Sequence, residues 1–165
     1  MIFVTVGEQL PFDRLIMAMD RWSAQTGHKV FAQVGRSDCR PDHIEYKDFL
    51  DQTEFRARME EARLIVAHAG MGTIITSLEL GKPIVVMPRK AQLGEHRNDH
   101  QVATANRFSA LCYVEVAHDE HELWTKLDEI LLRIEQGPGE RKIIEPSPDL
   151  IRTIRDFILA GERNG

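Results

Sequence analysis

Two closely spaced glycines that follow a strand-like run are the strongest sequence signal for a ligand-binding loop. Gly70 and Gly72 lie in the segment Val66–Thr73 (VAHAGMGT), which leads into a helical pattern from Thr73. Glycine permits a positive φ or lets a ligand approach the backbone closely. A helix start also presents unpaired N–H groups and the positive end of the helix dipole. We therefore expect a phosphate or diphosphate site here, with an ordinary tight strand-to-helix turn as the alternative.

Neither of two common nucleotide-binding motifs is present. The chain contains no GxxxxGK[ST] segment, which argues against a P-loop kinase or ATPase. The loop after the first predicted strand, Gly7–Pro11, lacks the GxGxxG pattern of dinucleotide oxidoreductases.

A second candidate region is the long polar segment Pro88–Gln101. A connection with no function is usually shorter. His96 and His100 are four residues apart and could share a helix face, which raises the alternative of a zinc pair. The segment lacks the glutamate of HExxH, and the spacing places no third ligand. We therefore expect no metal, and favour hydrogen bonding of these polar side chains to a polyhydroxylated ligand.

The elements that would position these residues alternate along the chain. Five apolar runs predict strands, at Ile2–Val6, Lys29–Val34, Leu64–His68, Ile84–Met87 and Leu111–Val116. Six helical patterns are found: behind Pro11, behind the capping boxes Asp51/Glu54 and Asp119/Glu122, and over Thr73–Leu80, Asn98–Ala110 and 147–160. Such alternation predicts an α/β fold, a Rossmann-like parallel sheet with helices on both faces. Ligands of such sheets bind at the carboxyl ends of the strands.

Length and composition narrow the classes of protein. The 165 residues suit one domain, 1–165, and the net charge of −5 argues against nucleic-acid binding. The two cysteines, Cys39 and Cys112, have no ligand spacing and are expected to be reduced thiols. No targeting segment and no apolar run of about 20 residues is visible, so we expect a cytoplasmic protein that only a partner takes to a membrane.

Taken together, several segments resemble the C-terminal domain of glycosyltransferase family 28, in particular its single-domain, PssE-type subunits. The segments that carry the resemblance are Phe3–Gly7, Pro11–Leu15, His68–Thr73, Leu78–Pro83, Val85–Arg89, Gly94–His96 and Asp99–Gln101, in the family's order. The resemblance implies the donor-binding half of a GT-B glycosyltransferase, which binds a UDP-sugar and needs no cofactor.

The resemblance also implies roles for individual residues. The diphosphate would lie on Gly70, Gly72 and Thr73, with the first loop at Gly7. Glu79 would bind the ribose, although a solvated charge is the alternative from position alone. The other assignments are uracil at Phe49 and Leu50, and the donor sugar at Glu95, His100 and Gln101. His68 would assist the departing phosphate as a hydrogen-bond donor, or would be a buried histidine that fixes the loop.

The family implies that a second half binds the acceptor. Because Met1 leads directly into the first predicted strand, we expect a membrane-associated subunit to supply that half and to hold a lipid-diphosphate-linked acceptor. The implied activity is an inverting hexosyl transfer in polysaccharide or glycolipid biosynthesis, at the inner face of the membrane. Two alternatives stay open: a non-catalytic sugar-nucleotide-binding accessory subunit, and an epimerase of the UDP-GlcNAc type. The predicted helix over 147–160 would pack on the core or dock to the partner.

Overall fold

The protein is built on one parallel six-stranded sheet. The computed structural model describes residues 1–110, 114–137 and 152. The strand order is β3-β2-β1-β4-β5-β6, the order of a doubly wound dinucleotide-binding sheet. The strands are β1 (Ile2–Thr5), β2 (Val30–Gln33), β3 (Glu45–Lys47), β4 (Leu64–His68), β5 (Ile84–Met87) and β6 (Glu115–Val116).

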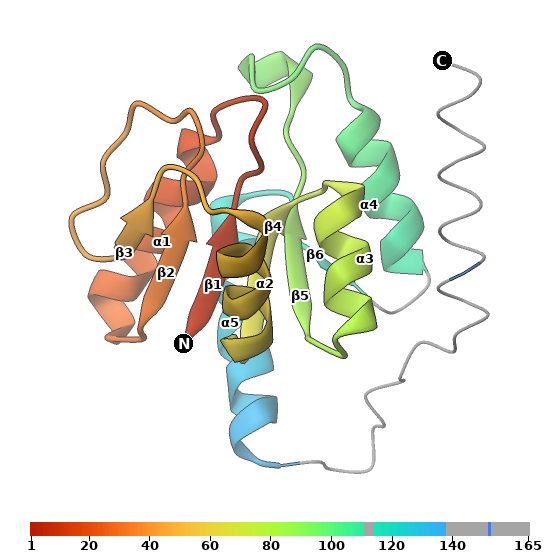
Figure 1. Ribbon diagram of the computed structural model, residues 1–165. Helices are drawn as coiled ribbons and strands as arrows, with labels where there is room; N and C mark the ends of the chain where they lie inside the picture. Colours follow the sequence, from red (N-terminus) through yellow and green to blue (C-terminus); the bar gives the residue numbers. More distant parts are fainter. Residues whose placement is uncertain (111–113, 138–151, 153–165) are drawn as a thin grey trace.

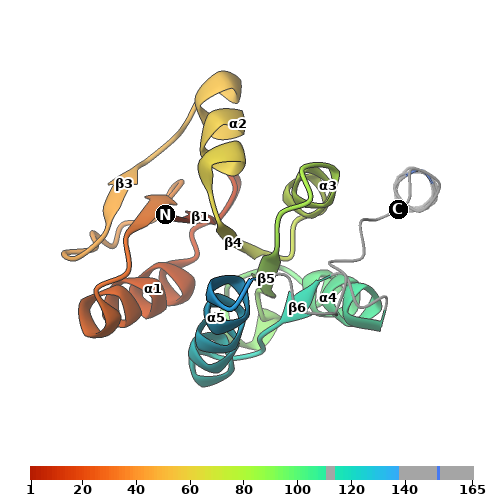
Figure 2. The same ribbon diagram turned by 90° about the horizontal axis from the view of Figure 1, so that it is seen from below.

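Helices cover both faces of this sheet. They are α1 (Asp13–Thr26), α2 (Gln52–Glu61), α3 (Met71–Glu79), α4 (His100–Ala110) and α5 (Glu120–Glu135), with a short 3-10 turn, η1 (Ala91–Leu93). Figure 2 shows α1 and α5 on one side of the sheet and α2 and α3 on the other. Asp51 and Asp119 each accept a hydrogen bond, at 2.8 Å, from the backbone N–H three residues later. Both predicted capping boxes therefore begin helices as expected.

The alternation of side chains along each strand divides the core into two layers. Val4 and Val66 pack with α1 and α5, whereas Phe3 and Ile65 pack with α2 and α3. All four are fully buried. Burial on both faces explains why these strands appear in the sequence as continuous apolar runs rather than as an apolar–polar alternation.

Several boundaries differ from the prediction. No sequence pattern predicted β3, because its three residues are polar and exposed at the edge of the sheet. Helix α3 begins at Met71 rather than Thr73, and α4 at His100 rather than Asn98. Only Glu115–Val116 of the last predicted strand is assigned; residues 111–113 lie outside the described residues, as does the helix predicted over 147–160 apart from residue 152.

The topology singles out one place on the sheet. The chain runs outward from β1 through β2 to β3 and then crosses back to β4 on the other side of β1, so the strand order reverses between β1 and β4. In sheets of this kind a ligand binds in the crevice outside the carboxyl ends at that reversal. The loops after β1 and β5 rise above the carboxyl ends there (Figure 1). No helix in the described part of the chain is both long and apolar enough to cross a bilayer.

Candidate functional site

His68 joins the loops after β1 and β4, because its ring packs directly on a glycine from each. A Cβ atom added to Gly7 would lie 2.8 Å from Cε1 of His68, and one added to Gly70 only 2.2 Å from Nε2. Neither position therefore has room for a side chain. Gly7 also has a φ of +73°, which favours glycine, but Gly70 has an ordinary φ of −91°. Of the two reasons considered for a glycine at this position, a positive φ therefore does not apply to Gly70, whose absent side chain instead makes room for the imidazole.

Gly72 stands in a different environment. It lies in the first turn of α3, is exposed, and a Cβ added to it would meet nothing within 4 Å. Its φ is not positive either, so no described contact or backbone strain explains a glycine there. Glycine in a helix is less stable than alanine by up to about 1 kcal/mol, and the open space leaves the backbone accessible to a ligand.

The start of α3 presents unpaired backbone donors. Gly70 is the N-cap and contributes no side-chain bond. Among the described residues, the amides of Met71, Gly72 and Thr73 donate no backbone hydrogen bond, and Ile74 makes the first helical one, to the Gly70 carbonyl. Together with the dipole of a nine-residue helix, these amides have the arrangement that binds anions.

The His68 side chain is held neutral. Burial, followed by the positive charge of Arg89, lowers the pKa of His68 to about 4. Its Nδ1 is buried and makes no hydrogen bond of normal geometry within the described residues. At neutral pH the imidazole therefore carries a single N–H, and can donate one hydrogen bond but cannot act as a charged acid.

Arg89 is the most deeply buried cation at this end of the sheet. It follows β5 by two positions and is only 3% exposed. Its Nη2 donates to the carbonyls of Val6 and Leu10, at 2.8 and 2.5 Å, and its guanidinium lies 5.0 Å from the ring centroid of Phe12. These contacts fasten the loop after β1 to the segment after β5. No separate role for Arg89 was expected from the sequence.

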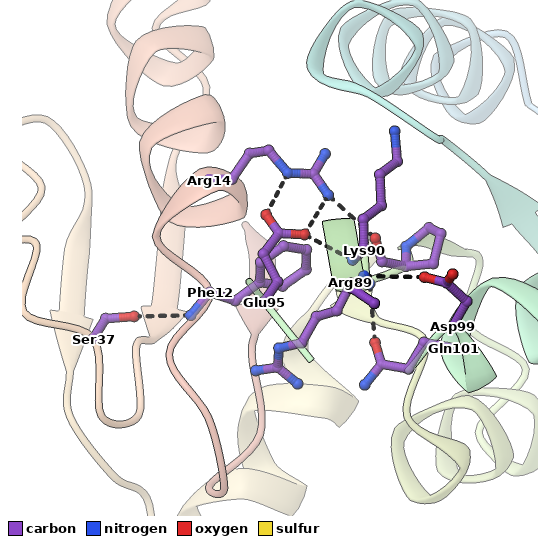
Figure 3. Close-up of polar contacts among 10 residues, drawn as sticks. Phe12, Arg14, Ser37, Arg89, Lys90, Glu95, Asp99 and Gln101 are labelled. Carbon is purple, nitrogen blue, oxygen red and sulfur yellow. Dashed lines mark hydrogen bonds and ion pairs between the residues drawn. The ribbon is translucent and has the colours of Figure 1, made fainter. Parts of the chain in front are cut away.

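A second arginine fastens the long segment after β5. Arg14 of α1 forms a bidentate ion pair with Glu95, at 2.6 and 2.9 Å, and also donates a hydrogen bond to the Pro88 carbonyl. Glu95 further accepts the backbone N–H of Lys90 at 2.9 Å (Figure 3). Both Glu95 oxygens are therefore engaged within the protein, in a place where the sequence predicted a contact to the sugar.

The remaining predicted sugar-binding residues lie at the start of α4. Gln101 accepts the backbone N–H of Arg89 through Oε1 at 3.1 Å, and Asp99 accepts that of Ala91 at 3.0 Å (Figure 3). His100 is the first residue of α4 and is exposed. The amide nitrogen of Gln101 makes no hydrogen bond among the described residues, so it is available to a ligand.

The predicted nucleoside-binding residues do not form one cluster: two of them follow β3, and the third lies at the end of α3 opposite the glycine turn. Phe49 and Leu50 precede α2, at the carboxyl end of β3; Phe49 is 48% exposed and Leu50 is buried. Glu79 is the last residue of α3 and is exposed. The described residues contain no group of three or more His, Cys, Asp or Glu side chains that could hold a metal ion.

Comparison with known proteins identifies the family. The model of the glycosyltransferase family 28 C-terminal domain matches residues 1–154. The chain belongs to this family. Its fold agrees: the parallel sheet with helices on both faces is the Rossmann-like half of a GT-B glycosyltransferase, as the sequence predicted.

Individual family 28 relatives and solved structures are similar over most of the chain. The human UDP-N-acetylglucosamine transferase subunit ALG13 is 27% identical over 158 residues, which cover 89% of this chain and 12% of that protein. This chain thus spans about an eighth of that relative's length. An NMR structure of ALG13 has a TM-score of 0.58 at 22% identity, covering 93% of this chain and 96% of that one. MurG from Acinetobacter baumannii has a TM-score of 0.56 at 18% identity, covering 93% and 44%.

Proposed function

We propose that this chain is the donor-binding subunit of a family 28 hexosyltransferase. It holds a UDP-sugar, while a second, membrane-associated subunit holds an acceptor linked to a lipid diphosphate. The hexose is transferred with inversion, in polysaccharide or glycolipid biosynthesis at the cytoplasmic face of the membrane. The name of the human relative, a transferase subunit, supports both the donor class and the need for a partner.

The observation that carries this proposal is the turn from β4 into α3. Gly72 leaves open space over the first turn of α3, where three amides donate no backbone hydrogen bond to any described residue. The turn lies beside the reversal of strand order between β1 and β4, where doubly wound sheets bind their ligands. In this proposal a diphosphate binds to these amides, the nucleoside extends toward Phe49 and Leu50, and the sugar extends toward His100 and Gln101; Glu79 would reach the ribose from the far end of α3.

The chemistry requires stabilisation of the departing diphosphate. As the bond between the anomeric carbon and the phosphate oxygen breaks, negative charge grows on UDP, and the amides at the start of α3 are already oriented toward it. His68, neutral and packed on Gly70, supplies one further hydrogen bond. The acceptor hydroxyl attacks the anomeric carbon from the side of the partner subunit and gives its proton to a base on that subunit, which also excludes water.

Two measurements test this function. Calorimetry with UDP, UDP-N-acetylglucosamine, UDP-glucuronic acid, UDP-galactose and UDP-glucose asks whether the chain binds a uridine nucleotide and which sugar increases the affinity. Transfer assays with the partner subunit, this chain and both together then separate a catalytic subunit from an accessory one. Transfer only with both supports the proposal; full transfer by the partner alone contradicts it.

A further inference from the structure

The buried guanidinium of Arg89 lacks a compensating negative charge. Arginine has five N–H donors, and the two bonds from Nη2 leave those on Nε and Nη1 without an acceptor among the described residues. Its two acceptors are neutral carbonyls, and no described carboxylate lies within ion-pair distance of it. A cation that is 3% exposed and unpaired costs several kcal/mol, so the position calls for an anion.

The nearest carboxylate does not serve as that anion. Glu95 acts on Arg89 only at longer range, because its two oxygens are bound to Arg14 and to the backbone N–H of Lys90. Arg14 balances the charge of Glu95, so the Arg14–Glu95 pair contributes no net charge. The positive charge of Arg89 is left over at the carboxyl end of the sheet.

A continuous series of contacts connects Arg89 with the glycine turn. Its Nη2 holds the carbonyl of Val6, the next residue is Gly7, Gly7 packs on the ring of His68, and that ring packs on Gly70. His68 and Arg89 are also close enough for the guanidinium to disfavour protonation of the imidazole. The unpaired charge is therefore linked to the turn that begins α3 through Val6, Gly7 and His68.

We infer that Arg89 is the cation that binds the diphosphate of the donor electrostatically, and that it does so while clamping the loop between Val6 and Leu10 over the same site. This inference rests on the proposed function and adds to it a residue outside the predicted set. A buried charge acts through a medium of low dielectric constant, so it stabilises an anion more than an exposed lysine or arginine would. Because the charge faces the phosphates, it favours UDP over uridine.

The test compares UDP with uridine on the full chain. Affinities for UDP, UMP and uridine are measured by calorimetry or ligand-observed NMR for the wild type, Arg89→Gln and Arg89→Lys. We expect Arg89→Gln to weaken UDP binding about 10- to 100-fold and to leave uridine binding within about twofold. Arg89→Lys, which keeps the charge, should restore most of the UDP affinity.

Arg97→Gln is the matched control, since Arg97 is an exposed arginine in the same segment and its replacement changes the net charge equally. Its UDP affinity should stay close to that of the wild type. Melting curves establish that each variant is folded. If Arg89→Gln does not fold, Arg89→Lys still tests the inference. Burial lowers the pKa of a lysine, so the Arg89→Lys variant should lose its charge as the pH rises. The preference of this variant for UDP over uridine should then fall between pH 7 and 9, whereas the preference of the wild type should not change.

Three results overturn the inference. An unchanged UDP affinity in Arg89→Gln shows that the charge does not act on the phosphates, and leaves the proposed function standing. An equal loss for UDP and uridine shows that Arg89 only maintains the loop. A wild-type chain that binds no uridine nucleotide, alone or with its partner subunit, refutes the proposed function itself.

Discussion

The imidazole of His68 occupies the volume in which a side chain at position 70 would lie. A Cβ on Gly70 would be 2.2 Å from Nε2 of His68, well inside any van der Waals contact. The same ring would be 2.8 Å from a Cβ on Gly7. One partly buried histidine therefore fixes the relative position of the loops after β1 and β4, the two loops that flank the reversal of strand order.

Alanine substitutions at Gly70 and Gly72 should have opposite effects on the stability of the fold. Gly70→Ala forces the methyl group into the ring of His68 and should destabilise the fold by about 2–3 kcal/mol. Gly72→Ala meets nothing in the structure and should raise stability by up to about 1 kcal/mol, yet weaken UDP binding. Chemical denaturation and calorimetry on both variants measure this. Equal destabilisation by the two would contradict the assignment, and an unchanged UDP affinity in Gly72→Ala would argue against a diphosphate at this turn.

Glu79 should act only on the ribose. Glu79→Ala should weaken UDP binding by about 1–3 kcal/mol, the usual loss for charge-assisted hydrogen bonds. The matched control is the ligand 2′,3′-dideoxy-UDP, which has no ribose hydroxyls and should bind the variant and the wild type equally. Calorimetry with both ligands gives the comparison. A similar loss for both ligands would mean that Glu79 supports the site in another way.

The His68 imidazole should stay neutral across the physiological range. Its pKa of about 4 lies below the usual 6.5, so the unfolded chain binds more protons than the folded one between these values. Stability should therefore rise with pH from about 4 to 6.5, and His68→Asn should flatten this part of the curve. NMR should show a constant imidazole ¹³Cε1 shift for His68 between pH 5.5 and 8. A midpoint near 6.5 would show that the ring is open to water.

The ion pair between Arg14 and Glu95 should be worth more than a surface pair. Their side chains are 13% and 12% exposed and share two contacts. A double-mutant cycle of Arg14→Met and Glu95→Gln should give a coupling free energy of about 1–3 kcal/mol by denaturation. A coupling near zero would place the pair with ordinary surface ion pairs.

The same two variants test whether Glu95 also binds the sugar. If Glu95 only anchors the segment after β5, Glu95→Gln and Arg14→Met should change the affinity for UDP-sugar and for UDP by equal factors. A selective loss of UDP-sugar affinity in Glu95→Gln alone would support the contact predicted from the sequence. Calorimetry with UDP and UDP-sugar on both variants distinguishes an anchoring role of Glu95 from a sugar contact.

Features that depend on neighbours along the chain could be predicted from the amino-acid sequence. Apolar runs placed four strands within a residue or two, and the capping boxes at Asp51 and Asp119 located two helix starts, because burial periodicity and caps are local properties. The motifs at His68–Thr73 and Gly94–Gln101 led to the correct family. Edge strand β3 was missed, since three exposed polar residues carry no burial pattern.

The contacts among the site residues depend on long-range packing and could not be predicted from the sequence. Arg14 and Glu95 are 81 positions apart, and nothing near either one indicates the other. The sequence suggested positive φ or ligand approach for Gly70, whereas folding brings the ring of His68 into that space. In the sequence, Arg89 is one charged residue in a polar segment. In the folded protein it is buried against Val6, Leu10 and Phe12. Burial and charge balance are sums over segments distant in sequence, so they exist only once the chain has folded.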